Sequence, residues 1–219
     1  MKTPLTKARL RQHWQYSWWK YLLLVVLALG GWNILFAVTA YRPPAEKIVD
    51  LYVYGYADTE KLGAYLAKVR EEQLPEMEQM NAVEVLPDET YGSMVLATRL
   101  AAAEGDLYVL PRTYFQQYAS DGAFIELDGQ TELIALCESM GVDLERCWRL
   151  NTDSGERHLY GFPVNGLPGL KELVSSSEEM YLCILFNNGN TDNVLQCMNI
   201  LVRDMIQPVE SQPDAGGNP

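Results

Sequence analysis

The apolar positions of the chain form one long run near the N-terminus, followed by shorter periodic segments. Residues 21 to 40 contain no acid or base and match the roughly 20 residues that a helix needs to cross a bilayer. Only Asn33 and Thr39 interrupt the run, whereas a buried core helix would show polar positions at helical spacing. We therefore predict a transmembrane helix over residues 21 to 40. A signal peptide cleaved after Ala40 stays open as a second interpretation.

The charges on either side of this run predict its direction. Basic residues precede it without any acid, whereas only Arg42 and Lys47 follow closely. Because basic residues stay on the cytoplasmic side, we expect residues 1 to 20 inside the cell and the C-terminal domain outside the plasma membrane. The basic residues are Lys2, Lys7, Arg9, Arg11 and Lys20.

After a proline-containing linker over residues 41 to 47, strand-like and helix-like segments alternate. Extended β-branched and aromatic runs are expected at 48 to 54, 82 to 86 and 106 to 110. Helical spacing is expected from Asp58 or Thr59 to about residue 75, at 91 to 103 and at 111 to 120. This alternation predicts an α/β domain of three layers around a mainly parallel sheet.

The C-terminal third is less regular in its pattern. We expect a helix at 131 to 140, an extended piece at 159 to 164, a loop at 165 to 169 and a buried strand at 180 to 186. A last amphipathic helix is predicted from 191 to 205. One domain thus covers residues 48 to 207, and residues 208 to 219 have the composition of a disordered tail.

Charge and cysteine content narrow the classes of function. The net charge is −12, and because the first 40 residues carry +5, the outer part carries −17, which argues against binding nucleic acid. The chain has two histidines far apart and no Cys-x-x-Cys pair, so a metal site is not expected. Cys137 and Cys147 bracket a short segment, and both a disulfide and free thiols stay open.

Two stretches carry a resemblance to a known family. Residues 98 to 110, Thr-Arg-Leu-Ala-Ala-Ala-Glu-Gly-Asp-Leu-Tyr-Val-Leu, and residues 119 to 128, Ala-Ser-Asp-Gly-Ala-Phe-Ile-Glu-Leu-Asp, resemble the extracellular solute-binding proteins of bacterial ABC importers. Tyr-Gly-Phe-Pro at 160 to 163 is similar to the element through which that family enters its second lobe. The resemblance implies one lobe of the periplasmic binding protein fold and an association with an ABC-type transporter.

The chain also departs from that family. Members are roughly twice as long, because two lobes close over the ligand, and here few residues separate Pro163 from the strand at 180. We therefore expect the second lobe to be absent or reduced to a loop. A transmembrane helix replaces the usual lipid-anchoring cysteine, and a lone lobe does not enclose a small ligand as pockets do.

Candidate binding residues follow the predicted strands, because ligands of open parallel sheets sit beyond the carboxyl ends of the strands. Aromatic faces with an arginine and a carboxylate suit a sugar, a peptide or an amino acid. The alternative is structural: Asp58 caps a helix, Arg112 pairs with a surface acid and the tyrosines fill the rim. The candidates are Tyr56, Asp58, Tyr91, Arg112, Tyr114 and Phe162, with Asp88 and Asn165 nearby.

No motif of a hydrolase, a phosphate-binding loop or a metalloprotease occurs, so we expect neither an enzyme nor a cofactor. Two hypotheses remain. The first is an extracytoplasmic interaction module of a membrane protein complex, anchored in the lipid bilayer and built on a truncated solute-binding lobe. The second is an accessory subunit that binds or senses a solute for a transporter.

Overall fold

The computed structural model describes residues 7–86, 91–176, 178–186 and 189–207. The chain divides into two units, Met1–Arg42 and Pro43–Pro219. The predicted disordered tail and the acidic candidate Asp88 lie outside the described residues.

The first unit is a single helix, α1, which runs from Lys7 to Thr39. It therefore begins inside the segment predicted to be cytoplasmic, earlier than the predicted start at residue 21. Its part from Ser17 to Thr39 has a mean hydropathy of 2.2 and is not buried against any described residue. This length and composition suit a membrane span, and a signal sequence would meet the same criteria.

A five-stranded mixed sheet forms the centre of the second unit, in the order β3-β1-β4-β9-β7. The central strand β1 pairs in parallel with both β3 and β4, whereas β9 runs antiparallel to β4 and to β7. Four of the five strands, β3, β1, β4 and β7, therefore run in one direction and β9 alone is reversed, so the sheet is mixed where a mainly parallel one was predicted. The strands are β1 Ile48–Tyr54, β3 Gln79–Val85, β4 Leu107–Pro111, β7 Gly161–Pro163 and β9 Met180–Ile184.

The antiparallel direction of β9 follows from the path of the chain. Met180, the first residue of β9, pairs with Pro111, the last residue of β4. The chain thus reaches β9 at the carboxyl end of the parallel strands and must run back. All five residues of β9 are buried, as their nearly continuous apolar character predicts.

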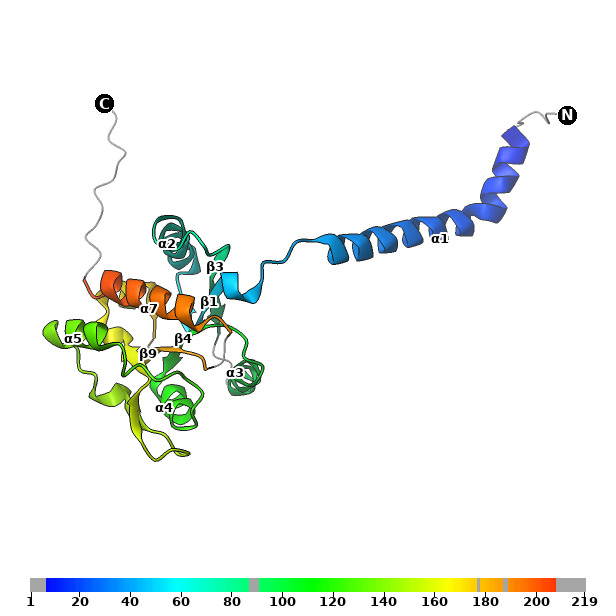
Figure 1. Ribbon diagram of the computed structural model, residues 1–219. Helices are drawn as coiled ribbons and strands as arrows, with labels where there is room; N and C mark the ends of the chain where they lie inside the picture. The colour runs from blue at the N-terminus through cyan, green and yellow to red at the C-terminus, as the bar shows by residue number, and fades with distance from the viewer. Residues whose placement is uncertain (1–6, 87–90, 177, 187–188, 208–219) are drawn as a thin grey trace, which may run out of the picture. The chain divides into compact units, whose positions relative to one another are not determined.

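Helices cover both faces of the sheet (Figure 1). Helices α2 and α7 lie on one side and α3 and α4 on the other. Tyr65 of α2 donates a hydrogen bond to Asp204 of α7 at 2.9 Å, which joins the first side. The long helices are α2 Thr59–Glu72, α3 Gly92–Ala101, α4 Arg112–Ser120, α5 Thr131–Ser139 and α7 Thr191–Met205.

The segment between α5 and β9 holds small elements that the sequence pattern did not reveal. Residues 165 to 169, predicted as a loop, contribute to a 3-10 turn and to the start of a short helix, α6, which has Pro168 at its first turn. The strand pair β2–β8 closes this segment onto the end of β1. The small elements of this segment are β5 Trp148–Leu150, β6 Arg157–Leu159, α6 Pro168–Leu173 and β8 Val174–Ser175, with 3-10 turns η2 Glu145–Cys147 and η3 Val164–Gly166. Strand β2 Tyr56–Ala57 and the 3-10 turn η1 Ala45–Lys47 lie next to β1 in the sequence.

The four cysteines belong to the core of this unit. Cys137 and Cys147 are both fully buried free thiols, in contrast to the bridge that their spacing allowed. Cys183 lies in β9 and Cys197 in α7, and both are also free and buried. Burial raises the pKa of the Cys137 thiol to about 11, which keeps it protonated at neutral pH. The cysteines thus act as small apolar core residues.

Candidate functional site

An open cleft of about 910 Å³ lies at the carboxyl ends of the parallel strands β1 and β4. This is the edge at which open α/β sheets bind ligands, and where the sequence predicted a site. The described residues that line the cleft are Tyr54, Gly55, Tyr56, Ser93, Pro111, Thr113, Tyr114, Val164, Asn165, Lys171, Val174, Ser175, Ser176, Glu178 and Met180.

Two tyrosines form an aromatic surface on the strand side of the cleft. The ring of Tyr54, the last residue of β1, meets the ring of Tyr114 edge to face, with 5.1 Å between the ring centroids. Tyr54 is buried and Tyr114 half-buried, so the pair is anchored in the core while one edge faces the cleft. Two residues beyond Tyr54, the side chain of Tyr56 is 63% exposed.

The opposite wall comes from the segment between β7 and β9. Its position is fixed by the antiparallel pairing of Tyr56 with Ser175 and of Ala57 with Val174. The backbone N–H of Asp58 also donates to the carbonyl of Leu173 at 2.9 Å. Both walls of the cleft therefore come from the unit that contains the sheet.

The polar groups of the cleft are hydroxyls, one amide and one pair of opposite charges. Lys171 on α6 and Glu178 before β9 are both exposed. Ser93 and Thr113 lie in the first turns of α3 and α4, and neither helix has a side-chain cap. These groups suit a ligand that both accepts and donates hydrogen bonds and presents a flat or apolar face to the tyrosines.

The described lining contains no histidine or cysteine that could serve as a general base or a nucleophile. Among the residues that the structure describes, no group of three His, Cys, Asp or Glu side chains could hold a metal ion. The groups that do line the cleft can recognise a ligand through hydrogen bonds and aromatic contact.

The structure brings two of the six predicted site residues, Tyr56 and Tyr114, into the cleft together with Asn165. Asp58 instead caps α2: its Oδ1 accepts from the backbone N–H of Lys61 at 3.1 Å. This hydrogen bond lowers the pKa of Asp58. Phe162 is fully buried in β7, and Tyr91 precedes α3 with 62% of its surface exposed but does not line the cleft.

Arg112 belongs to an ion cluster whose residues do not line the cleft. Its guanidinium lies 3.8 Å from the carboxylate of Glu179, which also binds Arg146 and accepts a hydrogen bond from the Tyr181 hydroxyl at 3.1 Å. The hydrogen bond from Arg146 is the main reason why the pKa of Glu179 is lowered. Asp58 and Arg112 thus make the helix-cap and ion-pair contacts that the structural interpretation expects.

Apart from Asn165, sequence reasoning missed the cleft residues that come from the opposite wall. Lys171, Ser175 and Glu178 follow no predicted parallel strand. They were therefore not selected by the rule that ligands bind beyond the carboxyl ends of such strands. The one signal in the sequence was Pro168, which favours the first turn of a helix and thus a structured element at this place.

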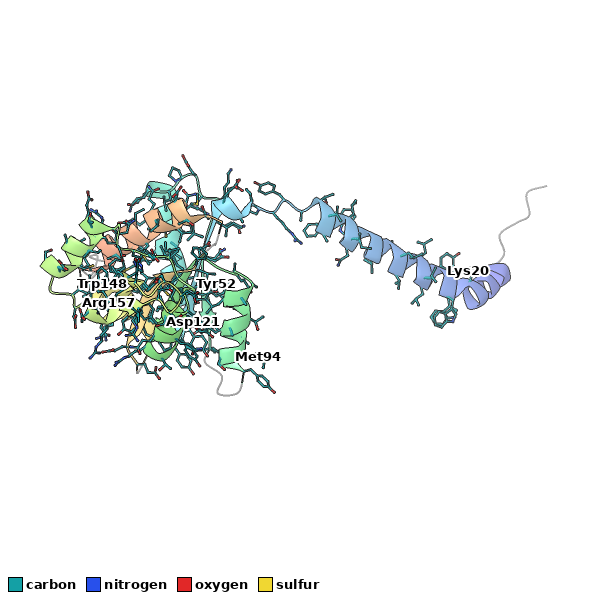
Figure 2. All side chains as sticks on the ribbon, turned by 60° about the horizontal axis from the view of Figure 1, so that its bottom comes forward. Lys20, Tyr52, Met94, Asp121, Trp148 and Arg157 are labelled. Carbon is teal, nitrogen blue, oxygen red and sulfur yellow. The ribbon has the colours of Figure 1, made fainter. Side chains whose placement is uncertain are left out.

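An exposed apolar surface adjoins the cleft on α3. Ser93 lines the cleft, and the next residues on the helix, Met94 and Val95, are 64% and 40% exposed. Met94 lies at the margin of the domain (Figure 2). Only Gly92 and Leu96 of α3 are buried, so most of this largely uncharged helix faces outward.

The sequence matches no known family model and no curated protein. Solved structures of extracellular solute-binding proteins are similar to part of it. The protein from Alicyclobacillus acidocaldarius is an extracellular solute-binding protein of family 1, with 20% identity and a TM-score of 0.34. The substrate-binding protein from Listeria monocytogenes, in complex with cycloalternan, has 18% identity and a TM-score of 0.39.

The third is the galacto-N-biose-/lacto-N-biose I-binding protein of the ABC transporter from Bifidobacterium longum, in complex with lacto-N-biose, with 18% identity and a TM-score of 0.34. Each alignment covers 53% of this chain but only 27% or 28% of the solved one, so the chain spans about a quarter of their length. At TM-scores below 0.5 the similarity assigns neither a ligand nor a partner to this chain.

Proposed function

We propose that the chain is a single-pass membrane protein whose α/β domain lies outside the cell. The apolar helix from Ser17 to Thr39 and the basic residues that precede it support this arrangement. In intact spheroplasts a protease should remove the C-terminal domain and leave an N-terminal tag protected. Release of an untagged C-terminal domain from the spheroplasts without any protease would indicate a cleaved signal peptide instead.

We further propose that the outer domain is an interaction module of a membrane protein complex, built on a single lobe of the solute-binding type. The observation that carries this proposal is the continuity between the cleft and the exposed apolar surface of α3. Tyr56 at the cleft and Met94 and Val95 on α3 are exposed apolar side chains, and grouped apolar side chains at a surface are typical of protein interaction sites. An extracytoplasmic segment of a membrane protein can contact both regions at once.

Photo-crosslinking in native membranes tests this proposal with the full chain. A photoreactive amino acid at Tyr56 or Met94 should form one discrete adduct. The same amino acid at Met140, which is 50% exposed at the end of α5, should not form it. A Val95→Glu change should abolish the adduct from Tyr56, because it places a charge in the apolar contact. Equal adducts from all three positions, or none, would refute the interaction module.

The cleft itself favours a second candidate function, that of a solute-binding or sensing subunit for a transporter. Its volume of about 910 Å³ lies within the range of small-molecule sites, and its tyrosines and hydroxyls suit a sugar, a peptide or an amino acid. In this case the apolar surface of α3 would be incidental.

A thermal-shift screen of the full chain in detergent separates the two candidates. Saturable stabilisation by one class of solute, lost in Tyr56→Ala and retained in Met94→Ala, would support the solute-binding function. The interaction module predicts no solute hit, and an adduct that requires Val95 as well as Tyr56.

A further inference from the structure

The apolar helix contains one polar side chain that its own fold does not satisfy. Between Lys20 and Arg42 there is no charged residue, and Asn33 is the single amide. Asn33 lies five residues beyond the midpoint of the span Ser17–Thr39, which corresponds to roughly 8 Å along the helix. Since the apolar core of a bilayer extends about 15 Å from its centre, Asn33 lies inside it.

The hydrogen bonds of α1 distinguish Asn33 from Thr39, the other polar residue in the apolar segment. The hydroxyl of Thr39 donates to the carbonyl of Leu35 at 2.7 Å and is thus satisfied within the helix. Asn33 has two donors and one acceptor in its side chain, and these form no hydrogen bond with any residue that the structure describes. In water such an amide is solvated, but within lipid only another protein group can satisfy it.

Small residues flank Asn33 on the same face of α1. Gly30 precedes it by three residues and Ala37 follows it by four, and both spacings bring positions to one side of a helix. A side-chain carbon added at Gly30 would meet no atom within 4 Å. Another helix can therefore approach closely at the height of the amide, as helices do at small residues in membranes.

We propose that two copies of this chain associate in the membrane through Gly30, Asn33 and Ala37 of α1, with each Asn33 amide hydrogen-bonded to its counterpart. This inference rests on the proposed membrane anchoring of α1. The amide argues for a second copy as the occupant, because it carries both a donor and an acceptor. Around a two-fold axis each Asn33 can donate to the carbonyl oxygen of the other, so one reciprocal contact gives a partner to the oxygen and to one N–H of each amide.

The charges of the chain are compatible with such a pair. The interface face of α1 carries no charge that would call for a partner helix of opposite charge. The two outer domains each carry −17 and repel one another, but at physiological ionic strength this repulsion is screened over about 8 Å. The contact inside the lipid is not screened.

Energy transfer between labelled copies measures this association. Full-length protein bearing a donor or an acceptor dye at its C-terminus is reconstituted in phosphatidylcholine vesicles and diluted with lipid. The wild-type chain should show transfer that falls with dilution as expected for a dimer. Asn33→Leu should raise the dissociation constant roughly five- to thirtyfold, which corresponds to the usual strength of hydrogen bonds between membrane helices.

A matched pair of glycine variants tests which face of α1 forms the dimer contact. Gly30→Ile should weaken the dimer, whereas Gly31→Ile, about 100° further around the helix, should leave it unchanged. A wild-type chain that is monomeric at every dilution, an unchanged constant in Asn33→Leu, or equal effects of the two glycine variants would each overturn the proposal. Carbonate extraction of the same membranes reports on the anchor separately. A chain that stays in the membrane but is monomeric refutes only the dimer, and a chain that is extracted refutes the anchor.

Discussion

The rings of Tyr54 and Tyr114 meet edge to face with 5.1 Å between their centroids, where β1 and α4 come together at the cleft. The pair joins the core to the candidate binding surface, because Tyr54 is buried while Tyr114 faces the cleft. A change in this contact should therefore alter recognition and stability together.

Tyr114→Leu should destabilise the domain and reduce the photo-adduct formed from Tyr56. Loss of an aromatic pair costs about 0.5–1.5 kcal/mol, and the shorter side chain removes one face of the cleft. Urea unfolding and adduct yield measure the two effects. Tyr118→Leu is the control, since Tyr118 lies one helical turn further along α4, is half-buried and does not line the cleft. An equal loss of adduct in both variants would argue against a role of Tyr114 in the cleft.

The His158 imidazole should make stability depend on pH above neutrality. Its Nδ1 lies 2.5 Å from Asp128, and Glu126 and Glu156 each lie 3.5 Å from its Nε2. The hydrogen bond to Asp128 is the main cause that raises the pKa of His158 above 6.5. A raised pKa in the folded state means that the stabilisation is complete below about pH 6.5 and is lost as pH rises through the folded value.

The difference in melting temperature between the wild type and His158→Gln should thus be largest near pH 6 and shrink toward pH 8. Asp128→Asn should remove most of this dependence, because it removes the carboxylate that raises the pKa of His158. The side-chain oxygen of the Asn can still accept from the backbone N–H of Leu159, as Oδ1 of Asp128 does at 2.7 Å. A difference that grows with pH would contradict the assignment.

Asp106, unlike His158, should lower the stability of the folded protein at neutral pH. Burial raises the pKa of this carboxyl to about 6, although its Oδ2 accepts from the backbone N–H of Asp50 at 2.8 Å. The folded state therefore favours the protonated form, and stability is lost as pH rises from about 4 to about 6.

Asp106→Asn keeps an acceptor for the Asp50 N–H and removes this loss. The shift of about two pKa units corresponds to roughly 3 kcal/mol, so the variant should be more stable than wild type by up to that amount at pH 7 and similar to it at pH 4. Urea unfolding at both pH values checks the sign of this difference in unfolding free energy. Destabilisation at pH 7 would show that the ionised carboxylate is needed by a group near Asp50.

The sequence predicted those helices and strands whose local pattern is compatible with only one kind of element. The strand at 48 to 54 has the predicted bounds, and α7 ends where its apolar stripe ends. Asp58 caps α2 as its position before a periodic segment predicts. These elements combine composition, period and capping residues that agree.

The direction of β9 was not predictable because a buried strand has the same apolar composition whether it runs parallel or antiparallel. The antiparallel pairing depends on where the chain returns after α6, and α6 is too short to show a helical period. The same segment supplies Lys171 and Glu178 to the cleft, so the wall opposite the strands was missed with it. The partner of Arg112 was not predictable for a different reason, since Glu179 lies far along the chain.

The buried cysteines should be unreactive in the folded protein. Burial raises the pKa of Cys197 to about 12 and that of Cys137 to about 11, so thiolate is scarce at neutral pH. Iodoacetamide should modify none of the four in native buffer. In denaturant without reductant it should modify all four, as mass spectrometry counts them, and a count of two would show that a disulfide such as Cys137–Cys147 forms after all.

Gly161→Ala should destabilise the domain by about 1–3 kcal/mol, the usual cost of extra atoms in a packed core. A side-chain carbon at this position of β7 would lie 2.5 Å from the carbonyl oxygen of Leu182 and 3.1 Å from the ring of Phe115. The first of these is backbone in the neighbouring strand β9 and does not move without disturbing the sheet. Gly129→Ala is the control, because the same carbon would meet nothing within 4 Å there. Urea unfolding should leave Gly129→Ala close to wild type, and an equally small effect of Gly161→Ala would show that β7 does not pack against β9 as closely as described.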